Sequence, residues 1–173
     1  MHRFFFSTKD TFINSGSNIL DGETFLDKNV GQDEILELKK VFYNRTFRNP
    51  TRILIQFDVD EIENFISSSN IGSTSYSASL RLYETKGTSG LSETYEIAAY
   101  PISQSWDEGI GKESDRPKTT EGASWKYRKN RDGASDLSWQ TAGGKYIAGD
   151  EVTQSFSSES PDINMNVTPI LKK

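Results

Sequence analysis

The sequence predicts an all-β protein, an antiparallel β-sandwich with one short helix and long loops. Several short stretches alternate apolar and polar residues, which is the period-2 pattern of strands between two environments. Only 34% of the 173 residues are hydrophobic, and Ser, Thr, Gly and Asn are abundant, as in β-proteins with long polar loops. Residues 95–109 read as a strand that ends in an anchored loop. Such loops, at the ends of a sandwich, are where function is expected.

Residues 95–100 alternate between two faces before the pattern stops. Pro101 removes a ladder donor, Trp106 supplies a large apolar anchor, and residues 107–109 have turn composition. This segment therefore predicts a strand followed by a loop that its tryptophan holds in place.

The N-terminal part predicts one strand clearly and one ambiguously. Residues 3–13 are rich in Phe and Thr and favour a first strand, with a turn over 15–18. Residues 33–42 fit both a helical stripe and a short strand. We favour the strand because the neighbouring segments are all β.

Residues 51–59 give the clearest strand pattern, in which Ile53, Ile55, Phe57 and Val59 alternate with Leu54, Gln56 and Asp58, so that one face is expected to meet the core. Residues 60–66 begin with acids and continue with apolar residues, which predicts a short surface helix with its charges at the favourable end. Residues 77–85 predict another strand.

Residues 110–150 lack regular periodicity, which indicates functional loops or short irregular strands. Alternation returns over 153–156 and 162–168, so two further strands are expected. The chain length fits one domain over residues 1–173, because a chain of this size can bury a substantial core.

Composition argues against several functional classes. There is no cysteine, and the only histidine is His2, so thiol chemistry, Cys-ligated zinc and a histidine-based triad are not expected. The net charge of −5 disfavours nucleic-acid binding. Residues 4–6 are too few for a signal segment and no run is long enough to span a membrane, so we expect synthesis in the cytoplasm.

Four segments, 52–59, 78–83, 105–109 and 163–168, resemble in order and spacing the DNRLRE (disaggregatase-related) domain. The likeness covers roughly residues 10–173, and Asn29-Val30-Gly31 sits where such domains often carry an Asn-aromatic-Gly turn. The full hexapeptide of the family name is absent, since the chain has Leu80-Arg81-Leu82 within Ala-Ser-Leu-Arg-Leu.

Residues 122–128 and 154–156 look most like versions of this domain in virion proteins of tailed phages, particularly marine ones. The resemblance implies a jelly-roll-like β-sandwich, related in shape to carbohydrate-binding modules, with no catalytic residues to carry over. Such domains usually continue through a short helix into a last strand. Either a partner supplies that strand or the chain is the ordered part of something longer, and we favour the second.

Five aromatic residues are candidates for an interface or for stacking on sugar rings: Trp106, Trp125, Tyr127, Trp139 and Tyr146. Flat aromatic faces suit the C–H side of a pyranose. We favour loop anchors or interface residues, because tryptophan is commonly buried or found at interfaces.

A basic loop contains Lys126, Arg128, Lys129 and Arg131. It could contact phosphates, but a solvated loop is the simpler interpretation. The alternative is contact with an acidic region, such as residues 21–37 of another subunit, which would favour head-to-tail assembly.

Asp58, Asp60 and Glu61 are candidates for a calcium site, because Ca²⁺ takes several oxygen ligands. Their spacing fits no EF-hand loop, and a helix start explains Asp60 and Glu61. Asp107 and Glu108 are a poor glycosidase pair, since adjacent residues of an extended chain point to opposite sides. No cofactor is therefore expected, with calcium as the exception to test.

The expected function is that of a non-enzymatic structural component of a tailed-phage virion, in the tail, neck or capsid-surface layer. Its expected partners are other virion proteins and copies of itself, without nucleic acid or membrane. It would be made in the host cytoplasm and located in the virion. The alternative is a carbohydrate-binding module for a host-surface glycan, and the third possibility is a hydrolase fragment.

Overall fold

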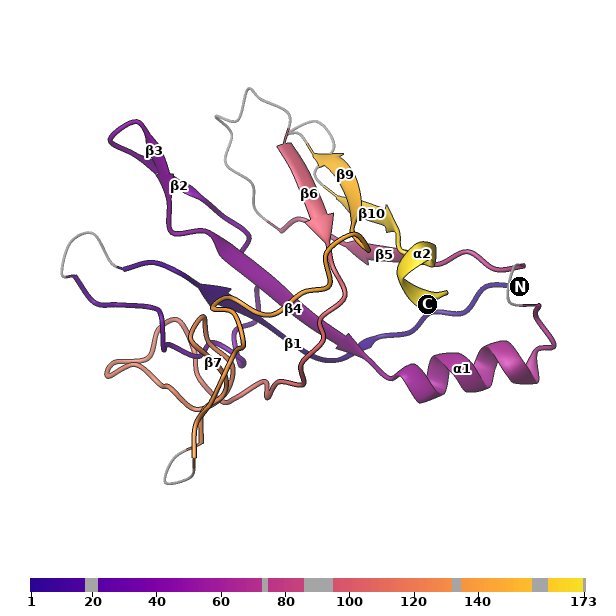
Figure 1. Ribbon diagram of the computed structural model, residues 1–173, viewed down its shortest axis with the longest axis horizontal. Coiled ribbons are helices and arrows are strands. Elements are labelled where there is room, and N and C mark those ends of the chain that lie inside the picture. The colour runs from indigo at the N-terminus through magenta and orange to yellow at the C-terminus, as the bar shows by residue number, and fades with distance from the viewer. Residues whose placement is uncertain (18–21, 73–74, 86–94, 132–134, 157–161, 173) are drawn as a thin grey trace. The chain divides into compact units, whose positions relative to one another are not determined.

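The computed structural model describes residues 1–17, 22–72, 75–85, 95–131, 135–156 and 162–172 (Figure 1). Over these residues the chain is largely β, which confirms the predicted class. The strands are β1 (Ser7–Asn14), β2 (Val41–Tyr43), β3 (Thr46–Arg48), β4 (Thr51–Phe57), β5 (Ser79–Leu82), β6 (Tyr95–Ala99), β7 (Tyr127–Lys129), β8 (Leu137–Ser138), β9 (Val152–Phe156) and β10 (Ile163–Asn166). The helices are α1 (Val59–Ser68) and α2 (Thr168–Leu171).

The chain forms two compact units. The first unit combines Met1–Val59 with Gln104–Lys145, and the second combines Asp60–Ser103 with Tyr146–Lys173. Across the described ranges the strands associate as antiparallel pairs: β1 with β4, β2 with β3, β5 with β10, β6 with β9, and β7 with β8. The single β-sandwich domain over 1–173 stays a prediction.

The first unit is built on the long ladder between β1 and β4, in which Phe12 lies opposite Ile53. Four consecutive residues at the end of β1, from Thr11 to Asn14, are buried, so this end is covered on both faces. The other buried apolar residues of this unit are Val30, Leu54, Trp106, Ala123 and Trp139.

The predicted core face of β4 needs correction. Leu54 is 3% exposed, whereas Ile53, Ile55 and Phe57 are only half-buried. Val59 is 58% exposed and begins α1, so it is not part of the strand. Alternation identified the strand correctly, but both of its faces are partly covered. The period-2 pattern therefore does not show which face is buried more deeply.

The strand predicted over residues 33–42 is also wrong, because only its last two residues belong to β2. The backbone before β2 is held by Thr51 instead of a ladder, and the Thr51 N–H donates to Lys39 O at 3.0 Å. The Thr51 hydroxyl donates to Glu37 O at 2.7 Å and accepts from Lys39 N–H at 2.8 Å. One threonine thus satisfies backbone groups that a neighbouring strand would otherwise pair.

β2 and β3 form a hairpin that extends from the start of β4 (Figure 1). Its two turn residues, Asn44 and Arg45, have φ of 49° and 62°. Left-handed conformations at both positions are the signature of a type I′ turn, whose twist matches that of the flanking strands.

The second unit contains the β5–β10 and β6–β9 pairs. Residues alternate between half-buried and exposed along β5 and β6, as predicted. Met165 on β10 is 2% exposed, opposite Leu80. The helix expected over 60–66 is confirmed as α1, with Asp60 and Glu61 in its first turn.

Candidate functional site

The first unit contains a junction around Asn29, whose side chain is completely buried. Its amide nitrogen donates to Glu108 O at 2.7 Å and to Ala123 O at 2.8 Å. Its amide oxygen accepts from Gly31 N–H at 3.1 Å and from Gly111 N–H at 2.8 Å. Three of these four hydrogen bonds fix the loop over residues 108–123 to Asn29, and the fourth closes the local turn over 29–31.

Glycines make the close approach at this junction possible. A Cβ on Gly109 would lie 2.4 Å from Asn29 Oδ1, and one on Gly122 would lie 2.4 Å from Gly109 Cα. Both glycines also have positive φ, 86° and 112°. A side chain at either position would strain the backbone and displace its neighbour.

Trp106 and Trp139 are internal anchors of this loop region. Trp106 is 3% exposed, and the Lys9 ammonium lies 4.9 Å from its ring centroid. Trp139 is 5% exposed and donates from Nε1 to Ser124 O at 2.8 Å. Neither ring presents an open face to a sugar, so their loop-anchor role fits the structure.

Trp125 is half-buried and is covered by another cation of the same unit. The Arg52 guanidinium lies 4.9 Å from its ring centroid and also donates to Gly143 O at 2.6 Å. Gly143 itself lies against the Trp125 ring, where a Cβ would come within 2.7 Å of Cζ2. A ligand stacking on this ring would have to displace Arg52.

The two candidate tyrosines belong to different units. Tyr127 on β7 is half-buried in the first unit, with the Lys126 ammonium 4.8 Å from its ring centroid. Tyr146 in the second unit is 41% exposed and packs on Tyr100, with ring centroids 4.6 Å apart.

The basic loop contacts acidic and polar groups of its own unit. Lys129 Nζ and Arg131 Nη2 lie 2.8 and 3.2 Å from the Asp107 carboxylate oxygens. Arg128 donates to Ser105 O at 2.9 Å, while Lys126 is exposed. The predicted acidic counterpart in another subunit is thus not needed to explain Lys129 and Arg131.

The pKa of Asp107 reflects this arrangement. Burial acts to raise it, but the hydrogen bonds and positive charges of Lys129 and Arg131 outweigh burial and hold the pKa below its usual value. The carboxylate therefore works as a fixed anion that ties β7 to the loop following Trp106.

An open depression of about 490 Å³ lies beside the junction. It is lined by Asp107, Glu108, Gly109, Ile110, Glu121, Gly122, Asn130 and Arg131. Glu108 accepts a hydrogen bond from Asp10 N–H at 2.8 Å, so two of the lining carboxylates are engaged in holding the unit together.

The calcium candidates are exposed acids. Asp58 follows β4, and Asp60 and Glu61 occupy the first turn of α1, which supports the helix-start interpretation. Over the part of the chain that the structure describes, no cluster of three or more His, Asp or Glu residues could hold a metal ion. Within the same part, no helix is long and apolar enough to cross a bilayer.

Sequence reasoning identified the basic loop over 126–131 and missed a second basic region. Lys39, Lys40, Arg45 and Arg48 all fall on or beside the β2–β3 hairpin, and no Asp or Glu occurs between Glu37 and Asp58. This charge run was readable from the sequence. The interactions of Asn29 were not, because they join residues 79 and 94 positions apart.

Comparison of this chain with family models, curated proteins and solved structures finds no match.

Proposed function

We propose that this chain is a non-enzymatic structural component of a tailed-phage virion that acts through protein–protein contacts. The observation that carries the proposal is the Asn29 junction, in which one buried amide fixes a long irregular loop. Ionic groups on either side of that loop bind each other within the unit, because Asp107 forms ion pairs with Lys129 and Arg131. Loops stabilised in this way present a preformed surface to a partner, which lowers the entropic cost of assembly.

The likeness to the DNRLRE domain supports the same proposal. Its segments over 52–59, 78–83 and 163–168 coincide with β4, β5 and β10, and its 105–109 segment contains the buried Trp106. We propose on this basis that the strand pairs belong to a jelly-roll-like β-sandwich located in the tail, neck or capsid-surface layer.

The test is quantitative mass spectrometry of purified particles of the phage that encodes the chain. A structural component is present at a fixed number of copies per particle and remains after high-salt washing. Absence from the particles, with the protein found only in the lysate, would contradict the proposal.

The second candidate is a glycan-binding module, which the Tyr100–Tyr146 pair favours. These rings are 40% and 41% exposed and pack on each other in the second unit, so part of each ring is open to a sugar. A glycan array with wild type and Tyr146→Ala tests it. Specific binding that the substitution abolishes would support this function, and an array without signal would reject it.

A further inference from the structure

The β2–β3 hairpin exposes an aromatic pair on one of its faces. Phe42 and Phe47 lie directly opposite each other, with ring centroids 5.1 Å apart, and are 64% and 62% exposed. Val41, the aliphatic residue of the hairpin, is half-buried, so the open apolar surface of this element is aromatic. Exposed aromatic rings gathered on one small element are typical of an interaction surface.

The other face of the hairpin is partly covered by its own residues. Tyr43 lies opposite Thr46 on this face, and the Arg48 guanidinium lies 5.8 Å from the Tyr43 ring centroid. Arg48 also donates from Nε to the Thr46 hydroxyl at 3.3 Å. The more open aromatic face that the hairpin offers to a partner is therefore the one formed by Phe42 and Phe47.

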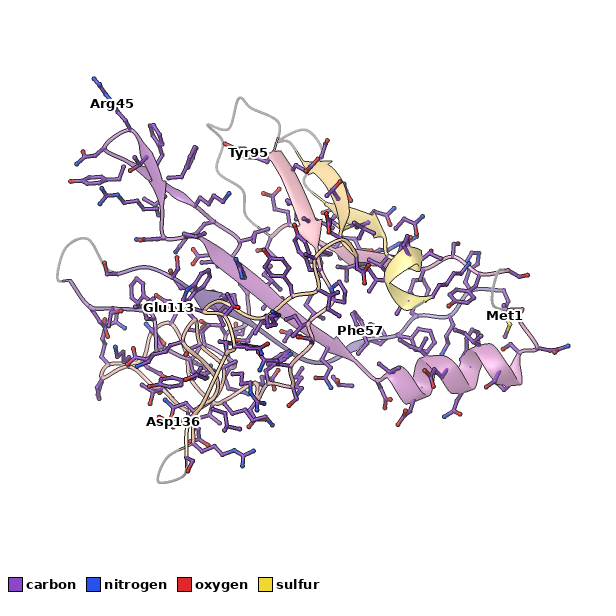
Figure 2. The ribbon with its side chains drawn as sticks, in the orientation of Figure 1. Met1, Arg45, Phe57, Tyr95, Glu113 and Asp136 are labelled. Carbon is purple, nitrogen blue, oxygen red and sulfur yellow. The ribbon has the colours of Figure 1, made fainter. Side chains whose placement is uncertain are left out.

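A cation stands at each end of this aromatic pair. Lys40 directly precedes β2 at the base of the hairpin, and Arg45 lies in its turn. Both side chains are exposed, and Figure 2 shows Arg45 at the tip, directed away from the strands. No Asp or Glu occurs between Glu37 and Asp58, so no carboxylate of the hairpin competes for these two charges. The surface thus combines two open rings with two exposed cations.

Single-stranded nucleic acid has the chemistry that this surface suits. Its bases present flat apolar faces that stack on aromatic side chains, and its phosphates bind Lys and Arg. A lipid surface fits less well, because the tip of the hairpin carries Arg45 where an inserted element would carry an apolar residue. A second copy of the same hairpin fits less well too, because its cations would repel these.

The net charge of −5 disfavours nucleic acid as a partner, but the charges are unevenly distributed. The second unit contains ten Asp and Glu against four Lys and Arg, a formal net charge of −6, whereas the first has fifteen against sixteen, a net charge of +1. Residues 38–57 contain five Lys and Arg and no Asp or Glu. Exposed charges more than about 8 Å apart are largely screened at physiological ionic strength, so this local charge decides what the hairpin attracts.

We infer that the Phe42–Phe47 face of the β2–β3 hairpin binds single-stranded nucleic acid without sequence preference. Bases stack on the two rings, and the phosphates on either side of them bind Lys40 and Arg45. Contact through two rings and two cations gives a modest affinity for one copy, which several copies held together along one strand would raise. This binding site goes beyond the proposed structural role and does not rest on it.

The experiment is fluorescence anisotropy of a labelled oligothymidylate of about 20 nucleotides, longer than one small β-domain covers, titrated with the purified full chain. At about 50 mM salt the wild type should bind with a Kd in the micromolar range. The affinity should fall as the salt concentration rises, with a log–log slope of about −1.4, because each phosphate contact to a single strand contributes about −0.7.

Two double variants separate stacking from charge. Phe42→Ala/Phe47→Ala should weaken binding by about tenfold or more and leave the salt slope unchanged, because it removes only the rings. Lys40→Gln/Arg45→Gln should weaken binding by about tenfold or more and bring the salt slope close to zero, because it removes the phosphate contacts. Binding of a duplex of the same length should not depend on the two rings, since its bases already stack on one another.

Two matched variants serve as controls. Phe4→Ala/Phe6→Ala removes two other phenylalanines of the first unit, 68% and 84% exposed, and should leave binding unchanged. Lys112→Gln removes another exposed cation of that unit and should likewise have no effect. Every variant should keep the wild-type urea midpoint in tryptophan fluorescence, which shows that a loss of binding is not a loss of folding.

Absence of binding at about 50 mM salt would overturn the inference, and so would binding that Phe42→Ala/Phe47→Ala leaves unchanged, since the contact would then be with charge alone. Phosphatidylcholine vesicles containing phosphatidylserine, and poly-glutamate, are titrated in parallel. Either of them bound through Phe42 and Phe47 as tightly as the oligonucleotide would also overturn it. Binding of the single strand by a chain absent from virions would refute the proposed function alone, and a virion component that ignores the oligonucleotide would refute this inference alone.

Discussion

The first unit buries both apolar and polar side chains, whereas Met165 is the only buried residue among those described in the second unit. In the first unit, the side chains of Asn29, Thr51 and Ser124 are all buried and hydrogen-bonded to backbone groups. In the second, paired strands expose alternate residues, and most apolar side chains are half-buried. The first unit is thus specified largely by polar contacts between distant segments, and the second by strand pairing.

The largest expected effect is that of Asn29→Ala. It leaves two backbone N–H groups and two carbonyl groups without partners in a buried place, so we expect the first unit to lose about 4 kcal/mol or more. All three tryptophans lie in this unit, so urea unfolding followed by tryptophan fluorescence reports the loss. Gln140→Ala, at an exposed position of the same unit, is the control and should change stability by less than about 0.5 kcal/mol. A cost for Asn29→Ala below about 1 kcal/mol would show that the junction is not what holds the unit.

Met165→Ala should destabilise the second unit by about 3 kcal/mol, because it leaves a cavity where the unit has its most buried side chain. Hydrogen exchange of the β5 and β10 amides measures this loss. Ile147→Ala, at a 43% exposed side chain of the same unit, should cost less than about 1 kcal/mol. If the tryptophan transition shifts as much as the amide exchange, the units unfold together and the contrast between them is wrong.

Gly122→Ala tests the close packing of the junction against a matched glycine. Gly122 and Gly144 both have positive φ, 112° and 95°, but a Cβ on Gly144 meets nothing within 4 Å. Gly144→Ala should therefore cost about 1 kcal/mol for the backbone alone, and Gly122→Ala about 2 kcal/mol more for the contact with Gly109. Equal urea midpoints for the two variants would show that the loop containing Gly122 can shift without loss of stability.

Most strands could be predicted from the sequence because alternation is a local property. The segments that became β4, β5 and β6 were all found, as was Trp106 as an anchor. The β2–β3 hairpin was missed, because its turn uses Asn44 and Arg45 without a glycine.

The site was less predictable than the strands. The Asn29 contacts join segments that only the folded chain brings together, and no periodic pattern marks them. Burial of Trp139 and the cover of Trp125 by Arg52 likewise depend on tertiary packing. Aromatic composition could therefore indicate anchored loops, but not which rings remain open to a ligand.

The smallest expected effect is that of Asp107→Asn, which removes the anion between Lys129 and Arg131. The pKa of this carboxyl is lowered in the folded unit from 3.8, so its contribution is present above that pH and is lost as the pH falls through the folded value. The pair is partly exposed and screened by solvent, so the loss at neutral pH should be below about 1 kcal/mol. The difference in urea midpoint between wild type and Asp107→Asn, followed by tryptophan fluorescence, should shrink as the pH is lowered from neutral through the acid range below 3.8, because the wild-type carboxyl takes up its proton there. A difference that stays constant across this range would mean that Asp107 stabilises the first unit through hydrogen bonds alone. The charge of Asp107 would then not be one of the polar contacts that distinguish the first unit from the second.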